Sequence, residues 1–132
     1  MTRTGRCLCG SVRFEVDTEQ WMSVSCHCRD CQYIAGGHPA VAVPMPLASL
    51  KLTGSISEYR SKADSGIEVR RVFCPTCGTH LYSGNSSNPD YVAIKLGTLD
   101  DADGLAPMIH IWTASAPSWH HIDTNATRIP KQ

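Results

Sequence analysis

Residues 26–31 have the sequence Cys-His-Cys-Arg-Asp-Cys, which places three cysteines within six residues. Burial alone does not call for thiols at this density, because valine or alanine would pack without their reactivity. In a C-x-C-x-x-C cluster, a tight turn followed by a helical turn can direct three sulfurs at one point. Thiolates at such spacing are zinc ligands in reduced proteins. We therefore expect Cys26, Cys28 and Cys31 to be zinc ligands.

The length and charge of the chain restrict its class. The 132 residues suffice for one domain with a real core but not for two. Twelve basic residues balance twelve acidic ones, so the formal net charge is zero. Nucleic acids and acidic membranes favour a basic face, and the charge balance therefore predicts neither as a partner.

The cellular setting follows from the absence of apolar segments. No apolar run approaches the roughly 20 residues of a membrane helix, and residues 1–6 contain no apolar signal region. We therefore expect a cytoplasmic protein with no membrane partner, in which the cysteines stay reduced. Their number, seven, is odd, which weakens a pure disulfide framework and favours metal.

The other four cysteines lie in two short motifs. Residues 7–10 form C-x-C-G, and residues 74–78 form C-P-x-C-G. The second motif is a zinc knuckle by its mechanics, because its tight turn aims both sulfurs at one point. Backbone N–H groups in such a turn bond to the sulfurs, and Gly78 tolerates the unusual dihedral angles.

Short alternating patterns predict a mainly β fold. Apolar residues alternate with polar ones over residues 11–16 and 67–73, as in half-buried strands. Arg71 lies on the apolar side of the second strand, so we expect it near the rim or paired. A helical turn is predicted from Cys28 to Tyr33, ended by Gly36-Gly37. Shorter strands are predicted at residues 21–25, 39–43, 50–52, 56–60, 81–82, 91–96 and around 110–112.

The seven thiols divide as four plus three, and two divisions are open from spacing alone. One joins Cys28 and Cys31 with the two cysteines of the knuckle and leaves Cys7, Cys9 and Cys26. The other joins Cys7 and Cys9 with Cys74 and Cys77. We favour the second division because its remaining three cysteines are local. A closed set of four thiolates is structural, whereas an open set of three leaves one position for chemistry.

The order of these motifs resembles the glutathione-dependent formaldehyde-activating enzyme family, which includes centromere protein V. The resemblance spans nearly the whole chain, and its cysteine pattern is highly specific. It is carried by C-x-C-G, S-C-H-C-x-x-C, F-C-x-x-C-G-T, G-T-L-D-D and H-I-W, at residues 7–10, 25–31, 73–79, 97–101 and 110–112, with Trp119 beyond them.

The resemblance implies a single domain over residues 1–132, with several short coiled antiparallel β-sheets built around two zinc sites. It implies a structural zinc on Cys7, Cys9, Cys74 and Cys77 and a catalytic zinc on the other three cysteines. The implied activity is reversible addition of glutathione to formaldehyde, a carbon–sulfur lyase reaction in reverse. The partners would then be a small thiol such as glutathione and an aldehyde. The alternative is a non-catalytic zinc-stabilised β module that binds protein through exposed Trp and Tyr.

The histidines near these motifs are weaker candidates. His27 stands between two ligands in a tight turn, so we expect it to point outward. The alternative is a catalytic role, in which it supports the metal ligands or transfers a proton. His38 is expected either to line the open zinc position or to occupy a loop. His110 is expected to serve packing, and His120-His121 to lie at the surface.

Overall fold

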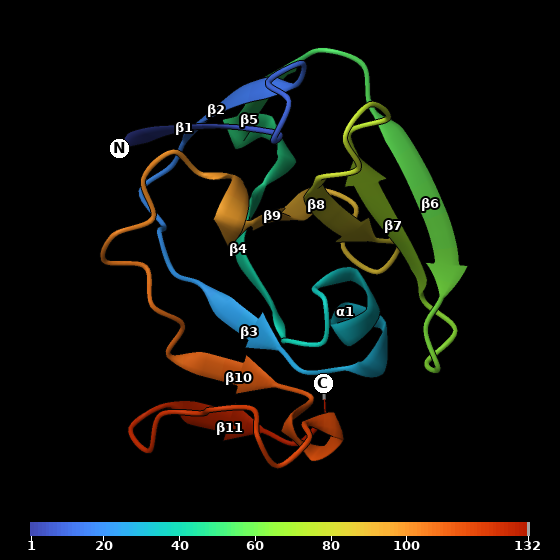
Figure 1. Ribbon diagram of the computed structural model, residues 1–132, viewed down its shortest axis with the longest axis vertical. Coiled ribbons are helices and arrows are strands. Elements are labelled where there is room, and N and C mark those ends of the chain that lie inside the picture. The colour runs from blue at the N-terminus through green and yellow to red at the C-terminus, as the bar shows by residue number, and fades with distance from the viewer. Residues whose placement is uncertain (132) are drawn as a thin grey trace.

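The computed structural model describes residues 1–131, and the chain there folds mainly into β-strands (Figure 1). A small antiparallel sheet has the strand order β1-β2-β5, with bounds Thr2–Arg6, Arg13–Asp17 and Leu50–Thr53. A larger sheet has the order β11-β10-β3-β4-β9-β8-β7-β6.

The strands of the larger sheet are short and follow the turn signals closely. In chain order they are β3 (Val24–Cys26), β4 (Ala40–Pro46), β6 (Ser57–Lys62), β7 (Glu68–Phe73), β8 (His80–Asn85), β9 (Tyr91–Lys95), β10 (Ile109–Ile111) and β11 (Thr127–Ile129). The single α-helix of residues 1–131, α1, spans Arg29–Ile34, and 3-10 turns occupy Leu47–Ser49, Leu96–Thr98 and Thr113–Ser115. No helix in this part of the chain is long and apolar enough to cross a membrane.

The predicted mainly β, single-domain fold is confirmed, with one difference in strand direction. Most neighbouring strands pair antiparallel, but β10 pairs parallel with both β3 and β11. The expectation of purely antiparallel sheets is therefore wrong at this edge, visible at the lower left of Figure 1. The sequence gives little sign of it, because a parallel partner arrives by a long crossover rather than a hairpin. Strand β11 is also exposed at every residue and has no apolar pattern to reveal it.

Strand β4 extends past residue 43, where it was expected to end. Its first residues pair with β3, and from Pro44 onward its only partner is β9. Proline lacks a backbone N–H, so it is tolerated where one edge of a strand makes no ladder bonds. Strand β4 therefore continues through Pro46.

The two faces of the larger sheet differ in what packs against them. Val43, Ile94, Tyr82 and Val72 are successive register partners on four strands, and all four are buried in the core. Side chains alternate along a strand, so the neighbouring positions point to the opposite face. Lys95 is one of those positions. The helix α1 follows β3 directly and contacts β4, where it brings the cysteine cluster close to the sheet (Figure 1).

Candidate metal centres and active site

The sulfurs of Cys7, Cys9, Cys74 and Cys77 all lie within 4.8 Å of one another. Cys9 Sγ is 3.6 Å from Cys7 Sγ and 3.8 Å from Cys74 Sγ. Tetrahedral zinc with Zn–S bonds of about 2.3 Å separates its sulfurs by about 3.8 Å, so this spacing fits a metal. A disulfide would require about 2.05 Å, and the cysteines are free.

Backbone and hydroxyl donors surround these four sulfurs. The Val12 N–H donates to Cys7 Sγ at 3.3 Å, and the Thr76 N–H donates to Cys74 Sγ at 3.4 Å. Burial raises the pKa of Cys7, but the Val12 N–H and neighbouring side chains outweigh it and bring the pKa down to about 7. The Thr79 hydroxyl, 3.2 Å from Cys77 Sγ, lowers the pKa of Cys77 to about 5. These donors favour the thiolate forms that a metal requires.

The sulfurs of Cys26, Cys28 and Cys31 form a second group, also within 4.8 Å of one another. Cys26 ends β3, Cys28 is the N-cap of α1, and Cys31 lies in its first turn. The Cys31 N–H donates to Cys28 Sγ at 3.3 Å, which ties the cap to the helix. Within residues 1–131 this group has three members, so a tetrahedral ion held there would keep one position free.

The acidity of the three thiols is strongly coupled. A side-chain hydrogen bond from Cys26 lowers the pKa of Cys28, whereas the bond to Cys28 raises the pKa of Cys26 to about 11. The pKa of Cys31 is also raised, first by its contact with Cys26. One thiolate therefore suppresses ionisation of the others, and all three can lose their protons only beside a cation. The donor set fits a thiophilic divalent metal such as zinc.

The geometry thus divides the seven cysteines as four plus three, with the local cluster as the smaller group. The other division, with Cys28 and Cys31 joined to the knuckle, is wrong. Gly78 has φ 78°, as the knuckle turn was expected to require, and its N–H donates to the Cys74 carbonyl at 2.9 Å.

His27 is fully buried, so the expectation that it points outward is wrong. Its Nε2 lies 2.8 Å from His110 Nδ1, and its Nδ1 lies 2.9 Å from His120 Nδ1. In an extended C-x-C segment the middle side chain points away from its two neighbours. Here that side faces the protein, because β10 pairs with β3 and the His27 N–H donates to the Ile111 carbonyl at 3.0 Å.

Only one arrangement of protons satisfies this histidine chain when its rings are neutral. The Gly37 carbonyl, 2.7 Å from His120 Nε2, can only accept, so His120 carries its proton on Nε2. Its Nδ1 then accepts from His27 Nδ1–H, and His27 Nε2 accepts from His110 Nδ1–H. Burial, with His110 and His120 nearby, lowers the pKa of His27 to about 4, which favours the neutral ring.

The last of these histidines also differs from expectation. His120 is buried, whereas it was predicted at the surface, and His121 is exposed as predicted. His38 is exposed, and its ring stacks on that of His120 with centroids 5.9 Å apart. Sequence reasoning missed His120 because the contact depends on a segment 93 residues away from His27.

Two basic side chains lie near the three-cysteine cluster, and neither was predicted as part of the site. Arg71 is buried, donates to Ser61 Oγ at 3.0 Å and approaches Asp30 at 3.9 Å. Lys95 Nζ lies 3.3 Å from Ser83 Oγ, and burial lowers its pKa while the cysteines of the cluster act to raise it. The expectation for Arg71, near the rim or paired, is confirmed by its partners. Both positive charges offset the negative charge of clustered thiolates.

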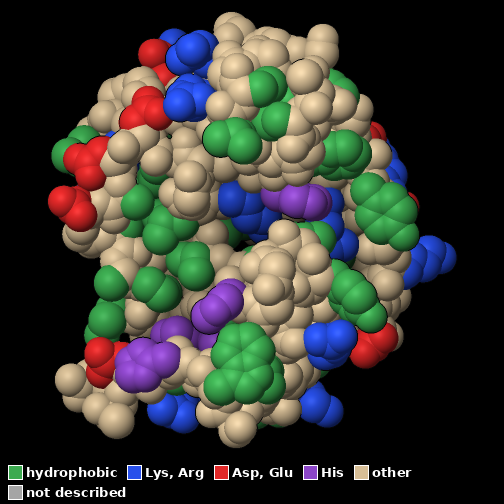
Figure 2. All heavy atoms as spheres, viewed as in Figure 1, with side chains coloured by type: hydrophobic (Ala, Val, Ile, Leu, Met, Phe, Trp, Pro, Cys, Tyr) green, Lys and Arg blue, Asp and Glu red, His purple; other side chains and the backbone are tan. Residues whose placement is uncertain are grey.

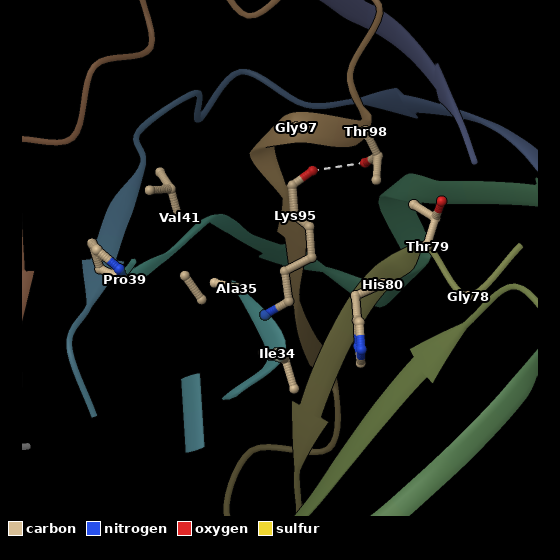
Figure 3. A pocket seen from close by; sticks show the side chains of 11 residues that line it. Ile34, Ala35, Pro39, Val41, Gly78, Thr79, His80, Lys95, Gly97 and Thr98 are labelled. Carbon is tan, nitrogen blue, oxygen red and sulfur yellow. Dashed lines mark hydrogen bonds between the residues drawn. The ribbon is translucent and has the colours of Figure 1, made fainter. Parts of the chain in front are cut away.

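A cavity of about 510 Å³ adjoins the cluster. Its wall includes Ile34 of α1, Ala40 of β4, His80 of β8 and Lys95 of β9 (Figure 3). Ala40 is the register partner of Cys26, and Ile34 follows Cys31 in the same helix. Figure 2 shows basic side chains beside a histidine in a hollow on this face. The volume is within the roughly 300–1,000 Å³ of small-molecule sites.

Comparison with known families agrees with the cysteine geometry. The family model described as glutathione-dependent formaldehyde-activating enzyme matches residues 2–115. The chain belongs to this family. The resemblance predicted from the motifs is thereby confirmed. Both cysteine groups lie within the residues that the family model matches.

Individual relatives are distant. An uncharacterized lyase of Schizosaccharomyces pombe is 29% identical over 92 residues, which cover 67% of this chain and 63% of that protein. The chain therefore spans less than two thirds of the length of this curated relative. A crystal structure of a Rhodobacter sphaeroides protein superposes with a TM-score of 0.59 at 24% identity, covering 79% of this chain and 91% of the other. The similarity to the Rhodobacter sphaeroides structure supports only the assignment of the fold.

Proposed function

We propose that this member of the glutathione-dependent formaldehyde-activating enzyme family is a zinc-dependent carbon–sulfur lyase-like enzyme. Its substrate would be a thiol–aldehyde adduct of the S-hydroxymethylglutathione type. Cys26, Cys28 and Cys31 would hold a catalytic zinc, and the four-cysteine group would hold a structural zinc. The observation that carries the proposal is the set of three convergent sulfurs, without a fourth ligand in residues 1–131, beside a cavity. The name of the S. pombe relative supports the lyase class.

The donor set suits sulfur chemistry. Zinc held by three thiolates is electron-rich, accepts a soft fourth ligand and would supply a substrate sulfur as the thiolate near neutral pH. The chain contributes the N-cap bond that fixes Cys28. It also contributes Arg71 and Lys95, whose positive charges favour the accumulation of negative charge beside the cluster.

The reaction balances without a redox partner. In the direction of addition, a thiolate sulfur attacks the aldehyde carbon and forms one carbon–sulfur bond. The carbonyl electron pair moves to the oxygen, which takes up one proton and becomes a hydroxyl. In the lyase direction the hydroxyl gives up its proton, the carbonyl re-forms, the same bond breaks, and the sulfur leaves as thiolate. The cavity beside the cluster gives the adduct a place to bind in a fixed orientation.

His27 acts in this proposal as a positioning residue rather than a catalytic one. It is buried, and its two ring nitrogens are occupied by His110 and His120. Because it lies between two of the proposed ligands, these bonds hold the C-x-C segment in place. Outer partners of this kind set the orientation of metal ligands.

The test is the metal content per chain, measured for the wild type and for Cys28→Ser with and without glutathione. We expect two zinc ions in the wild type and about one in a folded Cys28→Ser variant. With cobalt in place of zinc, glutathione should change the absorption spectrum of the wild type only. Tyr33→Ser, an exposed change in the same helix, serves as the matched control and should keep both ions.

One ion in both proteins, with no spectral response to thiol, would overturn the lyase proposal. It would favour the non-catalytic β module, whose binding surface would include the exposed Trp119 and Tyr59. A turnover assay with glutathione and formaldehyde then separates an active site from one that only binds thiol.

A further inference from the structure

Lys95 is a partly buried cation, and no acidic partner pairs with it in residues 1–131. Its side chain extends from β9 toward the end of α1 and lines the cavity (Figure 3). Its hydrogen bond is to the neutral Ser83 hydroxyl, and within residues 1–131 it forms no ion pair with Asp or Glu. An ammonium group removed from water is costly unless an opposite charge pairs with it. The thiols of the cluster supply part of that charge from one side.

His80 stands beside Lys95 on the neighbouring strand and lines the same cavity. Its Nδ1 is buried and has no hydrogen-bond partner in residues 1–131. Buried polar atoms are normally paired, so a turn of the imidazole that brings this nitrogen to the cavity would let it bind a ligand or a water. Both side chains therefore line one cavity, together with Ile34 of α1 and Thr79 of the knuckle segment.

We propose that Lys95 and His80 form a subsite for a carboxylate of the substrate, which restricts the enzyme to thiols that carry an acidic group. An ammonium and an imidazole N–H are donors that a carboxylate accepts, and charge-assisted bonds of this kind are the stronger class. The proposal rests on the proposed function for the thiol end of the substrate. The acidic end is recognised by groups outside the cysteine cluster.

A different role for Lys95 makes a different prediction. If it only neutralised the thiolates, its removal would weaken metal binding and leave the recognition of acidic groups unchanged. If it binds a carboxylate, its removal changes the preference between a free acid and its ester. The experiment therefore compares these two forms of one probe whose sulfur is blocked.

The zinc-loaded protein is titrated by calorimetry with S-methylglutathione and, separately, with its diethyl ester. The methylated sulfur cannot ionise, so binding reports the acidic ends of the probe alone. We expect the free acid to bind the wild type about 10–100-fold more tightly than the ester, as one or two charge-assisted bonds would give. Equal affinities, or no binding of the acid, would overturn the subsite without any variant.

The variant Lys95→Met then tests whether Lys95 causes the preference for the acid over the ester. Methionine nearly matches the length of lysine and removes a buried charge, so the sheet should keep its fold. We expect the acid to lose most of its advantage over the ester, while His80→Gln loses less because it can still donate one bond. Lys51→Met, an exposed lysine on β5, is the matched control and should leave both affinities unchanged. A Lys95→Met variant with the wild-type preference would overturn the assignment.

A thiol without a carboxylate separates this proposal from the proposed function. The cobalt spectrum of the wild type should respond to 2-mercaptoethanol. A response to this thiol without any preference for the acid over the ester would refute the subsite and leave the lyase proposal standing. Binding of the acid without a response to any thiol would refute the lyase proposal and leave the subsite standing.

Discussion

The two cysteine clusters use the same side chain in opposite ways. The four-cysteine cluster joins loops 65 residues apart, one between β1 and β2 and one between β7 and β8. Its Cys7 and Cys74 are part of the main hydrophobic core. The three-cysteine cluster comes from six consecutive residues at the edge of a cavity. Cysteines from distant segments bring the two sheets together, whereas the local cysteines come from one segment beside the cavity.

The middle residue of each C-x-C motif shows the same contrast. Leu8, between Cys7 and Cys9, is 79% exposed, whereas His27, between Cys26 and Cys28, is fully buried. Hydrophobicity alone would place the leucine inside and the histidine outside. In both motifs the middle side chain points away from the sulfurs, so its surroundings depend on what packs on that side. Solvent lies beyond Leu8, and His110 and His120 lie beyond His27.

The largest effect is expected from breaking the cluster that joins the sheets. We predict that Cys74→Ser lowers the thermal midpoint drastically or prevents folding, because the metal that ties the β1–β2 loop to the β7–β8 loop is lost. Structural zinc contributes binding energy that is comparable to the whole stability of a domain, about 5–15 kcal/mol. Circular dichroism during heating, together with zinc content, measures the effect.

Cys28→Ser is the matched control for this prediction, since it removes one ligand from the local cluster. It should remain folded and lose one ion. If the two variants melt at the same temperature, the distinction between a fastening cluster and an open one is wrong.

A smaller loss is expected when the histidine chain is cut. We predict that His27→Ala destabilises the protein by about 2–4 kcal/mol, because it leaves a cavity and two buried ring nitrogens without partners. Zinc affinity at the three-cysteine cluster should fall about 10–100-fold, while the other site keeps its ion. Urea unfolding and competition with a chelator measure these two quantities. His121→Ala, an exposed neighbour of His120, should change neither.

The sequence predicts the parts of the site that depend on local spacing. C-x-C-x-x-C and C-P-x-C-G each position their sulfurs through a turn of a few residues, so their geometry depends mainly on residues that are neighbours in the sequence. The helix after Cys28 and its end near Gly36-Gly37 follow from the same local rules, and both are confirmed. The division into four plus three needs the fold, because only the packing of the two sheets brings Cys7 and Cys9 to the knuckle.

The parts that were missed depend on contacts between distant segments. His120 lies beyond the residues that the family model matches, in a stretch with no strong pattern. Lys95 does alternate with the buried Val92 and Ile94, which places it on the opposite face. What covers that face could not be predicted, because the position of α1 over β4 is set by tertiary packing.

The charge beside the open cluster offers a third test. We predict that Arg71→Met lowers zinc affinity at the three-cysteine cluster about tenfold, because one nearby positive charge no longer offsets the thiolates. Its buried guanidinium helps to lower the pKa of Cys28, so its removal disfavours the thiolate. Arg71→Lys should restore most of the affinity, and Lys62→Met on the exposed strand β6 should have no effect. An equal loss at both clusters would show a general destabilisation instead of a local charge effect.

The smallest effect is expected at the residue that mirrors His27. We predict that Leu8→Ala changes the free energy of unfolding by less than about 0.5 kcal/mol, because the side chain is exposed and buries little surface. The Leu8 backbone keeps its place, since its N–H donates to Thr79 Oγ1 at 3.0 Å whatever the side chain. Urea unfolding of Leu8→Ala beside His27→Ala measures the contrast directly. Suppose that Leu8→Ala lowered the free energy of unfolding as much as His27→Ala. The middle side chain would then be needed for the turn itself, and the contacts with His110 and His120 would not explain the cost of losing His27.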